Sequence, residues 1–181
     1  TRTTATTYFQ LPAYQQQDLI QLIDGEVVLG MPPILKHQAI VGEILFLLLT
    51  IARKTGGKAF TSPVEVYLDE HNVFEPDVVF VAADNLAITQ QDDKRMVGAP
   101  DLVVEVLSPS TAKFDRQEKY RAYEQHGVRE YWIVDPLHET VEVWTHGKDG
   151  LFTRQGAYDQ DGTFQSKSLQ ATVPVTDIFS V

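Results

Sequence analysis

Residues 100–136 read PDLVVEVLSPSTAKFDRQEKYRAYEQHGVREYWIVDP, and this stretch decides the fold. An apolar run over 100–107 is broken by Ser-Pro-Ser, because proline lacks an N–H group and restricts the residue before it. Residues 111–126 have helical composition and are followed by Gly127 at the position of a helix C′ glycine. Residues 128–134 form a second β-rich run. A strand, a crossover helix and a strand predict a βαβ unit with two parallel, neighbouring strands.

Glu105 is the one charged residue within 102–107, the apolar part of the first of these strands. Alternation places it on one face with Val103 and Leu107, while the opposite face is also apolar, as in a central strand covered on both sides. A buried carboxylate is costly unless it is paired, hydrogen-bonded or bound to a metal. A salt-bridged or edge-facing glutamate is the structural alternative to a functional one.

The remaining chain predicts a mixed sheet with a second long helix. Residues 35–54 carry an apolar stripe at helical spacing that is wider than a surface helix needs. Asp24-Gly25 predicts a hairpin between 19–23 and 26–29. Further β regions are expected at 59–68, at 76–81 and from 141 onwards. We expect one domain over 1–181, with residues 1–10 as a flexible tail.

The composition argues against several classes of function but does not identify the function. The chain has 181 residues, 43% of them hydrophobic, a formal net charge of −10 and no cysteine. The charge argues against a broad basic nucleic-acid surface, and the lack of cysteine excludes thiolate chemistry and zinc–thiolate sites. The first ten residues contain no apolar signal region, and residues 44–52 are too short to span a bilayer. These features fit a cytoplasmic protein with no membrane partner.

Three residues could converge on one site. Asp77 opens one strand, Glu105 lies near the end of the next predicted strand, and Lys119 follows on the helix. Two close carboxylates need a cation between them, and oxygen ligands suit Mg²⁺ or Mn²⁺. By helical spacing Lys119 shares a face with three other side chains, those of Asp115, Arg116 and Tyr123. An exposed Asp115–Lys119 pair of little energetic weight is the alternative.

The arrangement resembles the PD-(D/E)XK nuclease superfamily, with its restriction-endonuclease-like core. It is most similar to the Uma-two family, a group named as a domain of unknown function and regarded as endonucleases. The similar stretches are LIDGEVV (22–28), HQAIVGEIL (37–45), EPDVVFV (75–81), residues 98–136 and the closing Ile178-Phe179. They span almost the whole chain, and residues 98–136 are specific for the family.

The resemblance implies a mixed α/β (α+β) fold, with a central mixed β-sheet flanked by helices and extra antiparallel hairpins. It implies that Asp77 and Glu105 bind the metal together with the Val106 carbonyl. The superfamily places its lysine two residues after the second acid, where this chain has Leu107, so Lys119 on the following helix would replace it. Accessory residues near the site would be Glu43, His37 and Glu26, with Arg116 and Tyr123 on the helix face.

Two functions of different classes follow. The first is a Mg²⁺- or Mn²⁺-dependent endonuclease that hydrolyses DNA, with Lys119 assisting at the scissile phosphate. The second is a nuclease-like fold kept as a non-catalytic binding or assembly module. The broad apolar stripe of 35–54 suits subunit contacts, so a homodimer or higher homo-oligomer is expected. A two-carboxylate glycosidase fits poorly, because it gives Lys119 no role.

Overall fold

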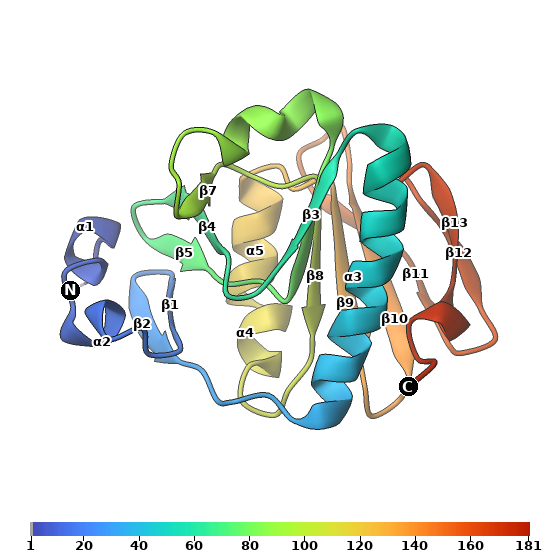
Figure 1. Cartoon of the computed structure of the whole chain (residues 1–181), viewed down its shortest axis with the longest axis horizontal. Coiled ribbons are helices and arrows are strands. Elements are labelled where there is room, and N and C mark those ends of the chain that lie inside the picture. The colour runs from blue at the N-terminus through green and yellow to red at the C-terminus, as the bar shows by residue number, and fades with distance from the viewer. Residues whose placement is uncertain (1) are drawn as a thin grey trace.

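The computed structural model describes residues 2–181, and its centre is a six-stranded mixed sheet in the order β11-β10-β9-β8-β6-β3 (Figure 1). Strands β8 (Leu102–Val106) and β9 (Glu130–Asp135) are parallel, with Glu105 opposite Ile133. Helices α4 (Ala112–Arg116) and α5 (Glu118–Gln125) form the crossover between them. The predicted βαβ unit is therefore confirmed.

Both faces of β8 are covered, as its sequence predicts, and all five of its residues are buried. One face packs on α3 (Leu35–Thr55), and the other packs on α5 and a second, smaller sheet. Figure 1 shows α3 on one side of the central sheet and α4 and α5 on the other. Val104 belongs to the core on the α3 side, whereas Val103 belongs to the core on the α5 side.

Helix α3 matches its predicted bounds and ends at Gly56, which has a φ of 78°. By length and composition it could also cross a membrane. In this fold it is a core helix, because Ile40, Ile44 and Leu48 are fully buried against the sheet. Its outer side is less covered than the broad stripe suggests, since Phe46 is 71% exposed.

The predicted helix over 111–126 is broken into two. Gln117 has φ −124° and ψ −80°, so α4 ends there and α5 begins at the next residue, Glu118. Gly127 adopts a φ of 77°, and its amide donates to the Glu124 carbonyl. The C′ assignment of Gly127 is therefore confirmed, whereas the single helix is wrong.

Strand β6 (Val78–Val81) lies antiparallel to β8, and β3 (Lys58–Thr61) lies antiparallel to β6. Val78 is opposite Val104, so the start of β6 lies beside the end of β8. The predicted β region 59–68 is two strands rather than one, because Ser62-Pro63 separates β3 from β4 (Glu65–Asp69) and the two join different sheets.

The smaller sheet has the order β2-β1-β5-β4-β7. Its predicted hairpin is present, formed by β1 (Ile20–Ile23) and β2 (Glu26–Leu29), and it also contains β5 (Asn72–Phe74) and β7 (Arg95–Val97). A 3₁₀ helix, η1 (Ala83–Thr89), precedes β7.

The N-terminal segment is not the flexible tail that its polar composition predicts. It forms α1 (Ala5–Tyr8) and α2 (Pro12–Gln15), which cover the outer face of the smaller sheet. Tyr8 is buried, and its hydroxyl donates to the Ile20 carbonyl at 2.7 Å. Tyr8 packs against the sheet together with Ala5, Phe9 and Tyr14, and the Ala5 amide donates to the Glu70 carbonyl, so the segment is ordered by these contacts.

The far side of the central sheet is antiparallel, as expected. Strands β10 (Thr140–His146) and β11 (Phe152–Tyr158) extend it. A separate two-stranded sheet, β12 (Thr163–Ser166) and β13 (Ala171–Pro174), covers the α3 side together with η2 (Val175–Asp177). The C-terminal residues pack against this core, because Ile178 and Phe179 are buried there.

Two glycines give a matched test of the backbone at the crossover. A Cβ on either Gly127 or Gly42 would meet nothing within 4 Å, so an alanine at each probes only the backbone. We expect Gly127→Ala to lower the free energy of unfolding by roughly 1 kcal/mol, because its φ is positive. Gly42→Ala, inside α3, should raise it by up to about 1 kcal/mol. Urea denaturation measures both, and changes of the same sign would contradict the assigned conformation.

Candidate active site

Asp77 lies where the antiparallel pairing of β6 and β8 brings two strand ends together. Its Oδ2 accepts a hydrogen bond from the Val106 amide at 2.7 Å. Its backbone carbonyl accepts from the Thr61 hydroxyl at 2.9 Å and from the Ser62 amide at 3.2 Å. The carboxylate is therefore held at the edge of the sheet, directly beside the end of β8.

Glu105 points from β8 toward α5 and is 3% exposed. Its Oε1 accepts two hydrogen bonds, one from Lys119 Nζ at 2.9 Å and one from the Tyr123 hydroxyl at 2.8 Å. Burial raises the pKa of Glu105 to about 8, although the neighbouring Lys119 ammonium opposes the rise. The salt-bridged alternative for Glu105 is thus present, and it does not exclude a functional role.

Lys119 is shared by two carboxylates. Besides Glu105, its Nζ lies 3.1 Å from Asp115 Oδ1, and both Lys119 and Asp115 are 1% exposed. Burial would lower the pKa of Lys119, but the charges of Glu105 and Asp115 outweigh it and raise that pKa, so the amine is an ammonium at neutral pH. The exposed, weak Asp115–Lys119 pair considered from the sequence is therefore wrong.

His37, in the first turns of α3, faces the same strand ends. Its Nε2 lies 2.9 Å from the Val106 carbonyl oxygen and 3.5 Å from Asp77 Oδ2. Burial opposes the charged form of the ring, but the hydrogen bond and charge of Asp77 outweigh burial and raise the pKa of His37. The histidine thus joins the helix to both strands at the site.

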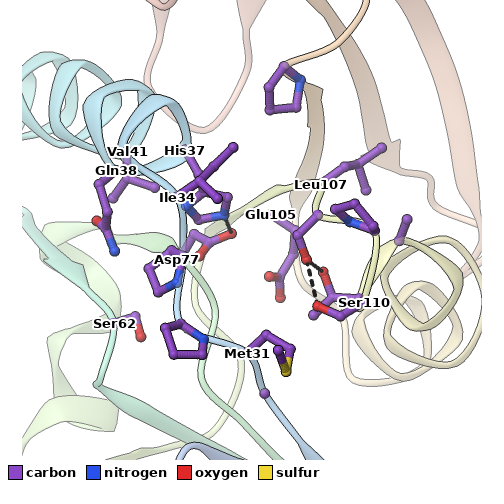
Figure 2. A pocket seen from close by; sticks show the side chains of 18 of the residues that line it. Met31, Ile34, His37, Gln38, Val41, Ser62, Asp77, Glu105, Leu107 and Ser110 are labelled. Carbon is purple, nitrogen blue, oxygen red and sulfur yellow. Dashed lines mark hydrogen bonds and ion pairs between the residues drawn. The ribbon is translucent and has the colours of Figure 1, made fainter.

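These side chains line a cavity of about 970 Å³ between α3, the strand ends and the loop after β8. Figure 2 shows Asp77 and Glu105 on its floor, with His37 above them and Met31, Ile34 and Leu107 on its walls. Most of the walls are apolar, with four prolines, Pro32, Pro33, Pro109 and Pro136. The charged side chains of the lining are those of Lys36, Glu75, Asp77, Glu105, Lys119 and Asp135, besides His37.

Glu75 is a further carboxylate of this cavity, and the sequence analysis gave it no role. Burial raises its pKa to about 7, with the charge of Glu65 adding to the rise and Lys119 opposing it. Its place in Glu75-Pro76-Asp77, two residues before an acid already singled out, was the available signal. The spacing alone could not show that both side chains face one cavity.

The Uma2 family model, described as "Putative restriction endonuclease", matches residues 5–176. The chain belongs to the Uma2 family. The resemblance inferred from the sequence is thus confirmed, and the family indicates a nuclease.

The Uma2 fold is also found among solved structures. The chain is similar to a structure described as a "putative nuclease belonging to DUF820" from Anabaena variabilis. The two superpose with a TM-score of 0.79 and 20% sequence identity, over 98% of this chain and 97% of the other. This likeness confirms the predicted mixed α/β fold. The comparison with curated proteins found no match.

Three charged residues that the Uma2 resemblance implied do not line the cavity, and neither do Val106 and Tyr123, which are buried beside it. Glu43 lies six residues beyond His37 on α3, which places it about 120° away around the helix. Glu26 is exposed on β2. Arg116 pairs with Glu142 on β10 at 2.6 Å, because the break at Gln117 turns α4 out of register with α5.

The floor of the cavity offers oxygen atoms to a cation. Among residues 2–181, no hydrogen bond is directed to Asp77 Oδ1 or Glu105 Oε2, and neither atom is a fully buried orphan. Within the same range, no three His, Cys, Asp or Glu side chains converge as a complete ligand set. Two carboxylates and the Val106 carbonyl suit a hard cation that keeps waters or substrate oxygens, as Mg²⁺ does.

The raised pKa of Glu105 makes a prediction about stability. Between pH 4.5 and about pH 8 the folded chain holds a proton that the unfolded chain releases, so stability falls as pH rises through this window. Glu105→Gln removes the charge and leaves Lys119 paired with Asp115 alone. We expect this variant to be more stable than the wild type at pH 8 by roughly 2 kcal/mol, and similar to it near pH 4.5.

Urea denaturation in EDTA across this pH range measures the difference. Glu75 contributes a similar dependence to both proteins, so the comparison between them isolates Glu105. Asp161→Asn, an exposed acid far from the cavity, is the control for net charge. If the difference in free energy of unfolding between Glu105→Gln and the wild type stayed constant with pH, the raised pKa of the buried Glu105 would be contradicted.

Proposed function

We propose that this chain is a metal-dependent endonuclease that hydrolyses phosphodiester bonds of DNA. The observation that carries the proposal is the meeting of Asp77 and Glu105 on the floor of one cavity, beside the Lys119 ammonium. Two carboxylates suit a divalent cation, and a buried ammonium suits the negative charge that develops on a phosphate. The family match supports the same class of reaction.

Mg²⁺ or Mn²⁺ would be held by Asp77, Glu105 and the Val106 carbonyl. A bound cation of this kind polarises a phosphate oxygen and lowers the pKa of a coordinated water. The residues fit such a cation because each carboxylate keeps one oxygen without a hydrogen bond among residues 2–181, and because a carbonyl oxygen has two lone pairs.

The chain's own residues would orient this chemistry. Lys119 and Tyr123 both donate to Glu105 Oε1, which fixes the carboxylate and directs Oε2 away from them. The Val106 amide does the same for Asp77 through Oδ2. His37 lies against the Val106 carbonyl and restrains the end of β8. Lys119 would stabilise charge on the scissile phosphate, since it lines the cavity and remains an ammonium.

The composition of the cavity mouth supports the second candidate, a non-catalytic binding or assembly module. Met31, Ile34 and Leu137 are exposed around it, and Leu35 is exposed at the start of α3. Exposed apolar groups at this density are typical of protein contacts. A homodimer or higher homo-oligomer would cover them, and this assembly is compatible with either function.

The first test is titration calorimetry of Mn²⁺ into the wild type and Asp77→Ala, followed by cleavage assays on DNA and RNA. We expect Mn²⁺ binding and Mn²⁺-dependent DNA cleavage in the wild type, and loss of both by at least about 100-fold in the variant, because a ligand oxygen is gone. Thermal melting should show that Asp77→Ala remains folded.

Glu26→Gln and Glu43→Gln are matched controls, because the resemblance implied these acids while the structure keeps them off the cavity. Both variants should bind Mn²⁺ like the wild type. A wild type that binds Mn²⁺ but cleaves neither DNA nor RNA would favour the binding or assembly module. Full cleavage by Asp77→Ala would show that the metal lies elsewhere.

The charges around the cavity predict a shallow salt dependence of DNA binding. Its lining includes only two basic side chains besides His37, and both are paired, Lys36 with Glu139 at 3.1 Å and Lys119 with Glu105 and Asp115. With about one phosphate neutralised, the slope of log K against log salt should be near −1. Fluorescence anisotropy of the wild type, with Ca²⁺ in place of Mg²⁺ to keep the DNA intact, measures this slope.

Lys36→Ala should flatten the slope further, whereas Lys148→Ala, in the turn between β10 and β11, should leave it unchanged. A slope near −5 would show that basic residues outside the cavity hold the DNA.

A further inference from the structure

Asp115 is a buried carboxylate to which neither the sequence nor the proposed function assigns a role. It is 1% exposed, and its Oδ1 lies 3.1 Å from Lys119 Nζ. Among residues 2–181, neither of its oxygens accepts a hydrogen bond of good geometry. An unsatisfied buried carboxylate is costly, so the ion pair with Lys119 is its main compensation.

The backbone at Asp115 is fixed independently of Lys119. Its amide donates to the Thr111 carbonyl within α4, and the Tyr131 hydroxyl of β9 donates to the Asp115 carbonyl at 2.9 Å. Lys119 lies on α5, beyond the break at Gln117. The contact between the two side chains therefore joins the two helical segments across the break, and one of them, α4, is anchored to the central sheet.

The geometry around Lys119 indicates the role of Asp115, the second acid that Nζ contacts. Glu105 Oε1 lies 2.9 Å from Nζ, so Glu105 alone would hold the ammonium directly against a proposed metal ligand. Asp115 adds a second contact, at 3.1 Å, from the α4 side. An ammonium has three N–H groups: one donates to Glu105 Oε1, the ion pair with Asp115 flanks Nζ from α4, and Lys119 also lines the cavity, so a further N–H is left for a ligand there.

We propose that Asp115 is a positioning residue, which holds Lys119 Nζ at the edge of the cavity so that its remaining N–H meets the substrate phosphate. This proposal rests on the proposed nuclease function for its effect on rate. It assigns Asp115 no contact with substrate or metal. Asp115, on the helical segment that follows Glu105, would thus affect the reaction only through Lys119.

The test is a double-mutant cycle with Asp115→Asn and Lys119→Met, measured by single-turnover cleavage with saturating Mn²⁺. Asparagine keeps the size of the side chain and removes the charge. We expect Asp115→Asn to lower the rate by about 10- to 100-fold, as a small displacement of a catalytic group does. The Mn²⁺ dissociation constant should change by less than about twofold, because both proposed metal-binding acids remain.

The cycle separates positioning from a general structural role. The double variant should be no slower than Lys119→Met alone, since Asp115 acts only through the lysine. A double variant that is slower than Lys119→Met by the full factor of Asp115→Asn would overturn the proposal. An Asp115→Asn rate equal to the wild-type rate would also overturn it. Asp161→Asn, an exposed acid, is the control for charge.

A readout that needs no activity keeps this proposal distinct from the nuclease function. In ¹H–¹⁵N NMR spectra, a buried and doubly paired lysine ammonium exchanges slowly, and Lys119→Met assigns its signal by removal. We expect Asp115→Asn to broaden or abolish this signal, and Asp115→Ser gives the same test should the asparagine variant not fold. An unchanged signal would overturn the positioning. If Asp115→Asn lost the Lys119 signal but the wild type cleaved no nucleic acid, Asp115 would still position Lys119, and the proposed nuclease function would be refuted.

Discussion

The Lys119 ammonium stabilises the buried Glu105 carboxyl group, which the apolar surroundings of the central sheet would otherwise disfavour. Glu105 is buried in a strand with apolar surroundings on both faces, and its Oε1 meets Lys119 Nζ at 2.9 Å. Burial costs both groups, and each makes the charged form of the other tolerable. Asp115 and Tyr123 complete this polar cluster from the two helical segments. The crossover helix is therefore required for the site as well as for the topology, because it supplies every partner that Glu105 Oε1 has among residues 2–181.

The second constraint is the antiparallel pairing of β6 with β8 beside the parallel pairing of β8 with β9. A carboxylate at the start of an antiparallel strand meets the end of its neighbour, and Asp77 thereby reaches the Val106 amide. Acids brought together in this way repel, and the raised pKa of Glu105 expresses that cost together with burial. A fold selected only for stability would not retain such a cluster. The destabilising arrangement is itself an argument that the floor of the cavity serves a ligand.

The sequence contained the main elements of this arrangement. Alternation and the Gly127 stop predicted β8, the crossover and β9, and the charge within an apolar strand identified Glu105. Three features depended on tertiary contacts that no local pattern contains. The break at Gln117 lies in a stretch of helical composition, and it moved Arg116 away from the face of Lys119. Tyr8 orders the N-terminal segment only because the sheet lies beneath it. Glu26 and Glu43 came from the resemblance alone, and His37 holds the position at the strand ends instead.

The same electrostatics suggest an order for the proposed reaction. Four carboxylates, those of Glu75, Asp77, Glu105 and Asp135, line the cavity, while Lys36 and Lys119 are engaged by acids. The raised pKa values of Glu75 and Glu105 keep part of this charge protonated at neutral pH, but a phosphate entering alone would still meet the Asp77 and Asp135 carboxylates and two lysines that are already paired with acids. A divalent cation on Asp77 and Glu105 would reverse the sign of the floor, so cation binding should precede substrate binding. Affinity would then come from the cation and from apolar contacts with Met31, Ile34 and Leu137, rather than from release of counterions by a basic surface. This explains how a chain with a net charge of −10 could act on a polyanion.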